Sequence, residues 1–467
     1  MGSHTVEKIG GTSMSRFHLV TDNVIIGSRS PSELYQRIFV VSAYGGITDL
    51  LLEGKKTGQP GIYAHFAAND SAWRDALETV RQAMCRFNAS FAEHGLDVAE
   101  ADAFVGQRLD GIRDCLLSLQ RLCSYGHFQL EQYLPMVREM ISAVGEAHSA
   151  HNAVAMLQSR GVNAVFVDLT GWRETNSLPF DDYIRAAFAD IDLASTLPIV
   201  TGYTLCSEGI MGTYDRGYSE ITFSRVAVIT EACEGIIHKE FHLSSGDPKL
   251  VGESAVRIIG HTNYDVADQM ADLGMEAIHP KASKPMEMSG ISIRVKNAFE
   301  PDHPGTVISH DYRSDTPRVE IITGRRGIRA IEIWDPDMVG QAGYDYRLLS
   351  YFADHGISYI AKNTNANTIT HYVPAGDPAV DSCVSTLRSA YPNAEVRTDD
   401  VCIVSAIGSN MKAPGMLATA ANILAEADVN ILAVDQCMRQ VNMQFILHDT
   451  DYDRSIIALH RGLIETS

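Results

Sequence analysis

Apolar positions in the first 300 residues alternate between short runs and long periodic stripes. Short runs rich in β-branched residues indicate strands, and they occur at 6–9, 38–41, 164–167, 198–200, 236–237 and 293–295. From about 72 to 157 the pattern is helical. There, leucine or isoleucine recurs at spacings of three and four, at Leu109, Ile112, Leu116, Leu119 and Leu122. Such spacing is typical of an amphipathic helix. A second helical stretch covers about 220–232. Strands that alternate with helices predict an α/β sheet covered on both faces.

The pattern changes after about residue 300. Residues 301–305 read P-D-H-P-G, a turn-rich segment typical of a linker. Two units with the same strand–helix–strand–strand order follow, the first with its helix at 343–355 and the second at 415–427. We interpret them as a weak internal repeat, each an antiparallel sheet with helices on one face. The predicted domains are 1–305, 316–392 and 396–467.

Composition narrows the class of protein. The chain has 467 residues, of which 45% are hydrophobic and 21% are charged, which is ordinary for a soluble globular protein. The formal net charge is −20. Nucleic acid recognition needs a basic face to meet the phosphates, so the charge balance disfavours a nucleic acid partner.

Cysteine usage and hydropathy indicate the compartment. The eight cysteines form no CxxC pair and no zinc-type spacing with histidine. We interpret them as buried thiols in a reducing compartment. The N-terminus lacks the basic and apolar regions of a secretory signal, and no stretch approaches the roughly 18 apolar residues of a membrane span. We therefore expect a cytoplasmic protein with no membrane partner.

Two glycine turns are the first candidates for chemistry. Lys8 precedes Gly10-Gly11, whose backbone N–H groups can approach an oxyanion closely. Thr12 and Ser13 can cap a following helix. The segment does not match the Walker pattern GxxxxGK[ST], and a GGTS turn alone is more often a tight strand–helix connection. A second glycine turn at 42–46 follows the next strand, and turns after neighbouring strands face one crevice. The pair of turns therefore favours a phosphate site.

Two further motifs could bind a substrate. Glu146 follows Gly145 in a helical stretch, where a surface glutamate is the simpler interpretation. Arg216 stands beside Gly217 at a helix start and could clamp a carboxylate through two hydrogen bonds. Ser219 would be the N-cap of that helix. An ordinary capped loop is about as compatible with the pattern.

Polar residues after the strand at 236–237 could face a nucleotide. They are Lys239 and Glu240, followed by Asp247-Pro248-Lys249. Taken alone they are more typical of a solvated loop. His279 has no partner at metal-ligand spacing, so we interpret it as structural.

In this order the motifs resemble those of the aspartate kinases of the amino acid kinase family. The matching segments are 8–13 for K-F-G-G-T-S, 40–51 for V-V-S-A-x-x-G-x-T-N-x-L, 145–146 for G-E, 198–203 for P-V-V-T-G-F and 274–280 for G-A-K-V-L-H-P. The two C-terminal units resemble the paired ACT domains of the same family. The resemblance spans nearly the whole chain.

The resemblance implies a fold and an activity. The fold would be a three-layer αβα sandwich followed by two ferredoxin-like ACT units. The activity would be transfer of the γ-phosphate of ATP, with Mg²⁺, to the β-carboxylate of L-aspartate. The product, 4-phospho-L-aspartate, begins the biosynthesis of aspartate-family amino acids or of ectoine. An amino acid effector at the ACT units and a homodimer or homotetramer are also implied.

The resemblance also assigns site residues, with Lys8 and Arg216 as the catalytic pair and no residue as a metal ligand. The phosphate would be bound by Lys8, Gly10, Gly11, Thr12 and Ser13. The substrate would be bound by Ser42, Thr48, Glu146, Arg216 and Ser219. The nucleotide would be bound by Lys239, Glu240 and Lys249.

Departures from the family pattern keep other functions open. The family's G-R-G-G-S-D contains Asp215, Tyr218 and Glu220 here, and the lysine of G-A-K-V-L-H-P is Glu276. Asp215, Tyr218 and Glu276 favour an alternative, a catalytically silent amino acid sensor that uses its ACT units. Intact Lys8, Glu146 and Arg216 favour catalysis. A glutamate kinase is a second alternative, which the paired C-terminal units argue against.

The sequence predicts weak or absent inhibition by lysine. Lysine-inhibited members carry V-D-x-I-x-T-S-E in the first ACT unit, where residues 359–366 read Y-I-A-K-N-T-N-A. The acidic groups that would pair with a bound ammonium are missing, a divergence similar to that of members dedicated to ectoine synthesis. Kinase activity measured against rising lysine concentration tests this, and tight inhibition would contradict it.

Overall fold

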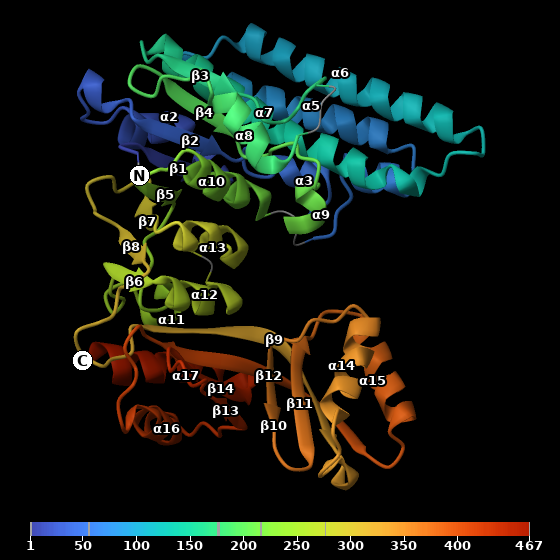
Figure 1. Ribbon diagram of the computed structural model, residues 1–467, viewed down its shortest axis with the longest axis vertical. Coiled ribbons are helices and arrows are strands. Elements are labelled where there is room, and N and C mark those ends of the chain that lie inside the picture. The colour runs from blue at the N-terminus through green and yellow to red at the C-terminus, as the bar shows by residue number, and fades with distance from the viewer. Residues whose placement is uncertain (1, 55–56, 175–177, 215–216, 276, 467) are drawn as a thin grey trace. The chain divides into compact units, whose positions relative to one another are not determined.

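A computed structural model describes residues 2–54, 57–174, 178–214, 217–275 and 277–466, which form two compact units (Figure 1). The first unit comprises Met1–His242 and Ile278–His310, and the second comprises Leu243–Ala277 and Asp311–Ser467. Residues 243–277 therefore group with the C-terminal part of the chain. The division into domains 1–305, 316–392 and 396–467 stays a prediction.

The first unit is built on a mixed sheet in the order β3-β4-β2-β1-β5-β7-β8. Its strands are β1 (Thr5–Ile9), β2 (Arg37–Val41), β3 (Ala164–Val167), β4 (Leu197–Thr201), β5 (Glu234–Lys239), β7 (Ser292–Asn297) and β8 (Thr306–Ser309). In this order, each strand from β3 across the sheet to β7 is parallel to its neighbour, and β8 is antiparallel to β7. The six strands predicted from sequence in this unit are confirmed, and β8 was missed.

Helices cover both faces of this sheet, as predicted. Its helices are α1 (Gly11–Met14), α2 (Phe17–Val20), α3 (Ile47–Leu51), α4 (Ile62–Ala67), α5 (Trp73–Ser90), α6 (Val98–Cys123), α7 (Leu134–Ser159), α8 (Phe180–Phe188), α9 (Ile210–Tyr214), α10 (Tyr218–Ile229) and α13 (Pro280–Met288). Ile9 and Phe39 belong to a core shared with α5, α6 and α7. Lys8 points to the opposite face, where it meets α10.

The periodic stripe on α6 is confirmed over its first part. Leu109, Ile112 and Leu116 are fully buried against the neighbouring helices, whereas Leu122 is 37% exposed. The helix continues past the core it packs against, so its last apolar residues face solvent. None of the helices in the described part of the chain is long and apolar enough to cross a membrane.

The second unit contains an antiparallel sheet in the order β10-β11-β9-β12-β14-β13. The strands are β9 (Ile321–Trp334), β10 (Ala361–Thr364), β11 (Thr368–Pro374), β12 (Glu395–Ile407), β13 (Ala433–Asp435) and β14 (Asn442–His448). Its helices are α14 (Tyr344–Asp354), α15 (Ala379–Ala390), α16 (Met416–Glu426) and α17 (Tyr452–His460). The repeat of strand, helix and two strands predicted from sequence is confirmed.

The two halves of this sheet have separate cores that interleave along the chain. One core contains Ile331 and Ile333 of β9 with residues of α14, β11 and α15. The other contains Ile322, from the beginning of β9, with residues of β12, α16, β14 and α17. The strands β9 and β12 run through both cores, so the first half is nested within the second.

Residues 243–277 pack against the C-terminal half of this sheet. They form α11 (Pro248–Val251), β6 (His261–Asn263) and α12 (Tyr264–Asp272). Leu250 and Val251 lie against the core that contains α16 and α17. Ser245 Oγ lies 2.9 Å from His460 Nε2, and Gln269 Oε1 accepts a hydrogen bond of 2.8 Å from Asn442. These contacts explain why the segment belongs to the second unit.

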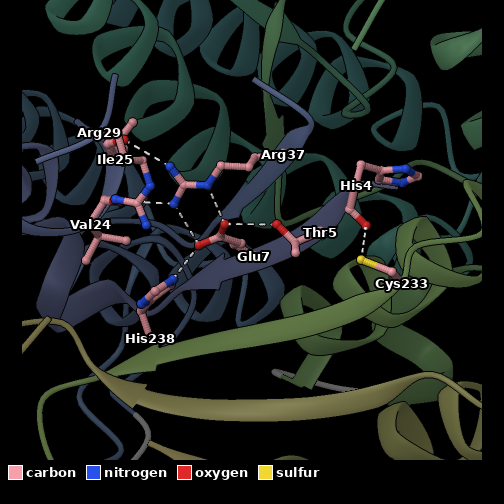
Figure 2. Close-up of polar contacts among 9 residues, drawn as sticks. All are labelled: His4, Thr5, Glu7, Val24, Ile25, Arg29, Arg37, Cys233 and His238. Carbon is pink, nitrogen blue, oxygen red and sulfur yellow. Dashed lines mark hydrogen bonds and ion pairs between the residues drawn. The ribbon is translucent and has the colours of Figure 1, made fainter. Parts of the chain in front are cut away.

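A buried charge cluster links the three central strands of the first unit (Figure 2). Glu7 of β1 accepts hydrogen bonds from Arg37 of β2 at 2.6 and 3.0 Å, and His238 Nε2 of β5 lies 2.7 Å from its carboxylate. Arg37 also donates to the carbonyl oxygens of Val24 and Ile25. Buried charges are tolerated only when they are paired and hydrogen-bonded, and this cluster meets both conditions.

The cluster keeps Glu7 ionised. Burial alone would raise the pKa of Glu7, but Arg37 and His238 outweigh it and hold the pKa far below its ordinary value. A carboxyl group with a depressed pKa stabilises the fold above its unfolded pKa, about 4.3 for glutamate, and loses that contribution as the pH falls. The cluster therefore contributes fully at neutral pH.

We predict that Glu7→Gln lowers the free energy of unfolding of the first unit by roughly 3–5 kcal/mol, because it leaves the buried Arg37 charge uncompensated. Urea titration followed by tryptophan fluorescence measures this. A Trp334→Phe background removes the tryptophan of the second unit and leaves Trp73 and Trp172 as reporters.

Glu93→Gln is the matched control, because Glu93 is an exposed glutamate of the same unit. We expect the control to change the free energy of unfolding by less than about 0.5 kcal/mol. Equal effects of the two substitutions would contradict a special role for the cluster.

Candidate active site

Four parallel strands of the first unit end at the same edge of the sheet, and the candidate residues follow their carboxyl ends. Gly10 to Ser13 follow β1, and residues 42–46 follow β2. The segment leading to α9 and α10 follows β4, and Glu240 follows β5. Ligands of open parallel sheets bind in the crevice outside these ends. The topology therefore brings together the two glycine turns, as the sequence predicted.

Two glycines allow the surrounding elements to close on Ala43. A Cβ atom on Gly11 would lie 2.6 Å from the carbonyl oxygen of Ala43. A Cβ atom on Gly145 would lie 2.6 Å from the Cβ of Ala43. Neither approach leaves room for a side chain. These glycines let α1 and α7 contact the turn after β2, which places Glu146 at the crevice.

Lys8 is held at the crevice by an ion pair. Its Nζ donates a 2.9 Å hydrogen bond to Glu220 Oε1 in the first turn of α10. The other carboxylate oxygen of Glu220 accepts the N–H of His279 at 2.7 Å. Burial alone would raise the pKa of Glu220, but Lys8, Lys239 and the hydrogen bonds lower it below its ordinary value. Glu220 is therefore ionised at neutral pH and orients the ammonium of Lys8.

Ser13 and Glu240 join the ends of β1 and β5. The Ser13 hydroxyl is fully buried and donates a 2.6 Å hydrogen bond to Glu240 Oε1. Thr12 is exposed beside it. Lys239 ends β5, where its charge helps to lower the pKa of Glu220. Four of the predicted phosphate and nucleotide residues thus lie around the ends of β1 and β5.

Glu146 is buried within α7 with one carboxylate oxygen bonded and the other unbonded. Its Oε1 accepts hydrogen bonds from the Tyr218 hydroxyl at 3.0 Å and from the Ala43 N–H at 3.3 Å. Its Oε2 has no hydrogen-bond partner among the described residues. Burial raises the pKa of Glu146 to about 7, against the opposing effect of Tyr218 and the Ala43 amide. The surface glutamate considered from sequence is therefore a buried carboxylate.

The other predicted substrate residues lie around the same turn. The backbone of Ser42 is fixed, because its N–H donates to Ile9 at 3.1 Å and its carbonyl accepts the Ser149 hydroxyl at 2.8 Å. Thr48 lies half-buried on α3. Ser219 is buried in the first turn of α10, but the residue that caps this helix is Gly217. The N-cap expectation for Ser219 was wrong, because the helix begins at Tyr218, two residues earlier than that expectation implies.

Some predicted residues are not placed beside Lys8. Arg216, Asp215 and Glu276 lie outside the described residues. Lys249 belongs to α11 in the second unit, where its backbone N–H bonds to Asp247 Oδ1 at 2.9 Å. The first unit by itself therefore does not contain a complete set of the predicted residues.

Three residues of the site were not predicted from sequence. Glu220 pairs with Lys8, Tyr218 bonds to Glu146, and the backbone of His279 bonds to Glu220. Glu220 and Tyr218 were noted only as departures from a family motif. A hydroxyl and a carboxylate two positions apart at a helix start are a local signal, but their partners are distant in sequence.

A cavity of about 1110 Å³ lies between α6, α7 and the loops that follow β3 and β4. Glu139 and Ala143 of α7 line it, together with Trp172 and Tyr203. Ala143 lies one helical turn before Glu146, on the same face of α7. The cavity thus extends along α7 to within one helical turn of Glu146.

Metal binding by protein groups alone finds no support in the described part of the chain. No cluster of three or more His, Cys, Asp or Glu side chains there is arranged to hold a metal ion. Mg²⁺ keeps several water ligands and is commonly bound through phosphates and one or two carboxylates. Glu240, beside the end of β1, is a carboxylate suited to that kind of site.

Comparison with known proteins identifies the family. A model of the amino acid kinase family matches residues 4–297, and an ACT domain model matches residues 404–463. An aspartate kinase of Stutzerimonas stutzeri (strain A1501), Ask_Ect, is 52% identical over 464 residues, covering 99% of this chain and 98% of that protein.

Solved structures show the same fold. The aspartate kinase of Clostridium acetobutylicum superposes with a TM-score of 0.74 at 17% identity, covering 98% of this chain and all of that one. Aspartokinase III of E. coli, in complex with aspartate and ADP, superposes with a TM-score of 0.71 at 19% identity, covering 99% of this chain and 100% of that one. The sheet, the crevice residues and these matches agree, and the chain belongs to the amino acid kinase family.

Proposed function

We propose that this protein transfers the γ-phosphate of ATP to the β-carboxylate of L-aspartate and so forms 4-phospho-L-aspartate. The observation that carries the proposal is the first turn of α10, which holds both Lys8, through Glu220, and Glu146, through Tyr218. A cation for a phosphate and a carboxylate for an ammonium are thus both held by one helix turn. The 52% identity to an aspartate kinase supports the same activity.

The mechanism follows from the charges of the two substrates. A carboxylate is already ionised near neutral pH, so the reaction needs no general base. The barrier arises from bringing one anion up to another, and positioning with charge neutralisation must supply most of the catalysis. Lys8 and the N–H groups of Gly10 and Gly11 would neutralise the transferring phosphoryl group. Mg²⁺, carried by the nucleotide, would neutralise further phosphate charge.

Recognition of aspartate would use its two other charged groups. Glu146 offers the unbonded Oε2 to the α-ammonium, and Arg216 would bind the α-carboxylate through two hydrogen bonds. Lys239 and Glu240, at the end of β5, would lie along the nucleotide. The relative E. coli aspartokinase III, whose structure contains aspartate and ADP, supports this pair of substrates.

The silent-sensor alternative loses part of its basis in the site. Tyr218 and Glu220, which depart from the family pattern, are both bonded to residues proposed to act in catalysis. They therefore complete the site instead of disrupting it. The effector and a homo-oligomeric state stay predictions based on the family, and a cytoplasmic location stays a prediction from the sequence.

Hydroxylamine trapping tests the activity, because it converts an acyl phosphate into a hydroxamate. We expect ATP-dependent hydroxamate from aspartate and none from glutamate in a parallel reaction. Lys8→Met should reduce turnover roughly 100- to 1000-fold, since one charge directed at the transferring group is worth about 3–4 kcal/mol.

Lys412→Met is the control for Lys8→Met, because Lys412 is exposed in the second unit. It should leave turnover within twofold of the parent protein. Folded parent protein that yields no hydroxamate from either amino acid would favour the sensor, and full activity of Lys8→Met would remove Lys8 from the mechanism.

The pH dependence of aspartate binding provides a second prediction. Because burial raises the pKa of Glu146 to about 7, the group is largely neutral below that pH and pairs poorly with an ammonium. We expect the KM for aspartate to fall as the pH rises from 6 to 8. Steady-state kinetics in that range checks this, and Glu146→Gln should give a high KM with no such limb. A flat KM in the parent protein would exclude Glu146 as the ammonium site.

A further inference from the structure

Two tyrosines tie the segment between β4 and α10 to one face of α7. Tyr203 donates a 2.6 Å hydrogen bond to Glu139 Oε2, and Tyr218 donates one of 3.0 Å to Glu146 Oε1. Glu139 and Glu146 lie about two turns apart on α7 and so share a face. The two tyrosine rings pack edge to face with their centroids 5.8 Å apart.

Burial and hydrogen bonding fix this arrangement of the two tyrosines. Both tyrosines are 2% exposed, so their hydroxyl groups need internal partners. The second oxygen of Glu139 accepts the N–H of Met211 at 2.7 Å, at the beginning of α9. The stretch from Tyr203 to Tyr218 is thus held at both ends and near its middle. Arg216, proposed to bind the substrate α-carboxylate, belongs to this stretch in the sequence.

We propose that Tyr203 and Tyr218 are positioning residues for aspartate recognition, each acting through a glutamate of α7. This inference rests on the proposed function. Tyr218 orients Glu146 and favours its ionised form for the substrate ammonium. Tyr203, with Glu139, holds the segment of Met211 against the face of α7 that also carries Glu146.

The two tyrosines have different electrostatic consequences. A hydrogen bond donated to a buried carboxylate stabilises its charged form. Tyr218 makes such a bond to Glu146. A water molecule could take the place of the Tyr218 hydroxyl only if this buried site had space for it. Loss of this bond would raise the pKa of Glu146 above about 7. Tyr203 does not contact Glu146, so its loss should displace the segment without changing that ionisation.

Because of the groups that surround Glu146, its ionisation depends on the hydrogen bond from Tyr218. From α10, Tyr218 and the neutral Ser219 face it, and the turn after β2 contributes the Ala43 amide. Titratable neighbours on α7 are engaged elsewhere, Glu139 with Tyr203 and His148 with Asn88. The described residues therefore include no other charged group bonded to Glu146.

The test compares Tyr203→Phe and Tyr218→Phe with Tyr125→Phe, a control at an exposed tyrosine beyond the end of α6. The KM and kcat for aspartate are measured from pH 6 to 9. In Tyr218→Phe, the fall of KM with rising pH should occur about one pH unit higher than in the parent protein, as the loss of one hydrogen bond to a carboxylate implies. Its kcat at pH 9 should stay within about twofold.

Tyr203→Phe should raise KM about fivefold at every pH without moving the limb. The control should match the parent protein. The proposal is overturned if Tyr218→Phe leaves the limb in place, or if Tyr203→Phe moves it as far as Tyr218→Phe does. A fall in kcat of more than tenfold at pH 9 with an unmoved KM also contradicts a positioning role.

Amide hydrogen exchange separates this inference from the proposed function, because it requires no activity. Exchange at the Met211 amide is measured by mass spectrometry of peptides that cover 205–212. Faster exchange in Tyr203→Phe than in Tyr125→Phe supports the tether, and equal exchange overturns it. If the parent protein makes no aspartyl hydroxamate, the proposed function fails and this measurement alone decides the tether.

Discussion

The hydrogen-bonded charge cluster of Glu7, Arg37 and His238 is the constraint on which the first unit depends. It joins β1, β2 and β5, and the carboxyl ends of those strands carry Lys8, the turn at 42–46 and Glu240. A slip of one residue between paired strands would turn every side chain to the opposite face. It would also leave Glu7 buried without its partners, at a cost of several kcal/mol. The cluster thus stabilises the register that the site requires.

On the opposite face of β1, side chains from the first turn of α10 bond to two ionisable residues of the crevice. Glu220 compensates Lys8, and Tyr218 supports Glu146. The two carboxylates of this site differ in pKa, because Glu220 has cationic neighbours whereas, among the described residues, only neutral donors bond to Glu146. One is ionised at all physiological pH values, and the other changes its charge near neutrality. A single helix end therefore supports both a fixed and a titrating carboxylate.

The second unit shows a different kind of organisation, in which two similar halves share their long strands. The core around Ile331 is enclosed in sequence by the core around Ile322 and Phe445, since β9 and β12 pass through both. Movement of either half must deform strands that the other half also uses. Residues 243–277 are packed on the same sheet through Leu250 and Gln269, so this part of the family match belongs to the second unit.

The sequence alone determined the α/β class, six strands of the first sheet, the repeat of the second unit and the family. These features are written in local periodicity and in glycine-bearing motifs at strand ends, which the chain displays without reference to distant partners. The family resemblance of these motifs also supplied Lys8, Ser42 and Glu146 as candidate site residues. Tertiary structure decided the rest: the pairing of Lys8 with Glu220, the burial of Glu146 under Tyr218, and the nesting of the two C-terminal cores. Each of these depends on residues far apart in the chain, whose contacts are set by sheet register and helix packing and leave no local pattern to read.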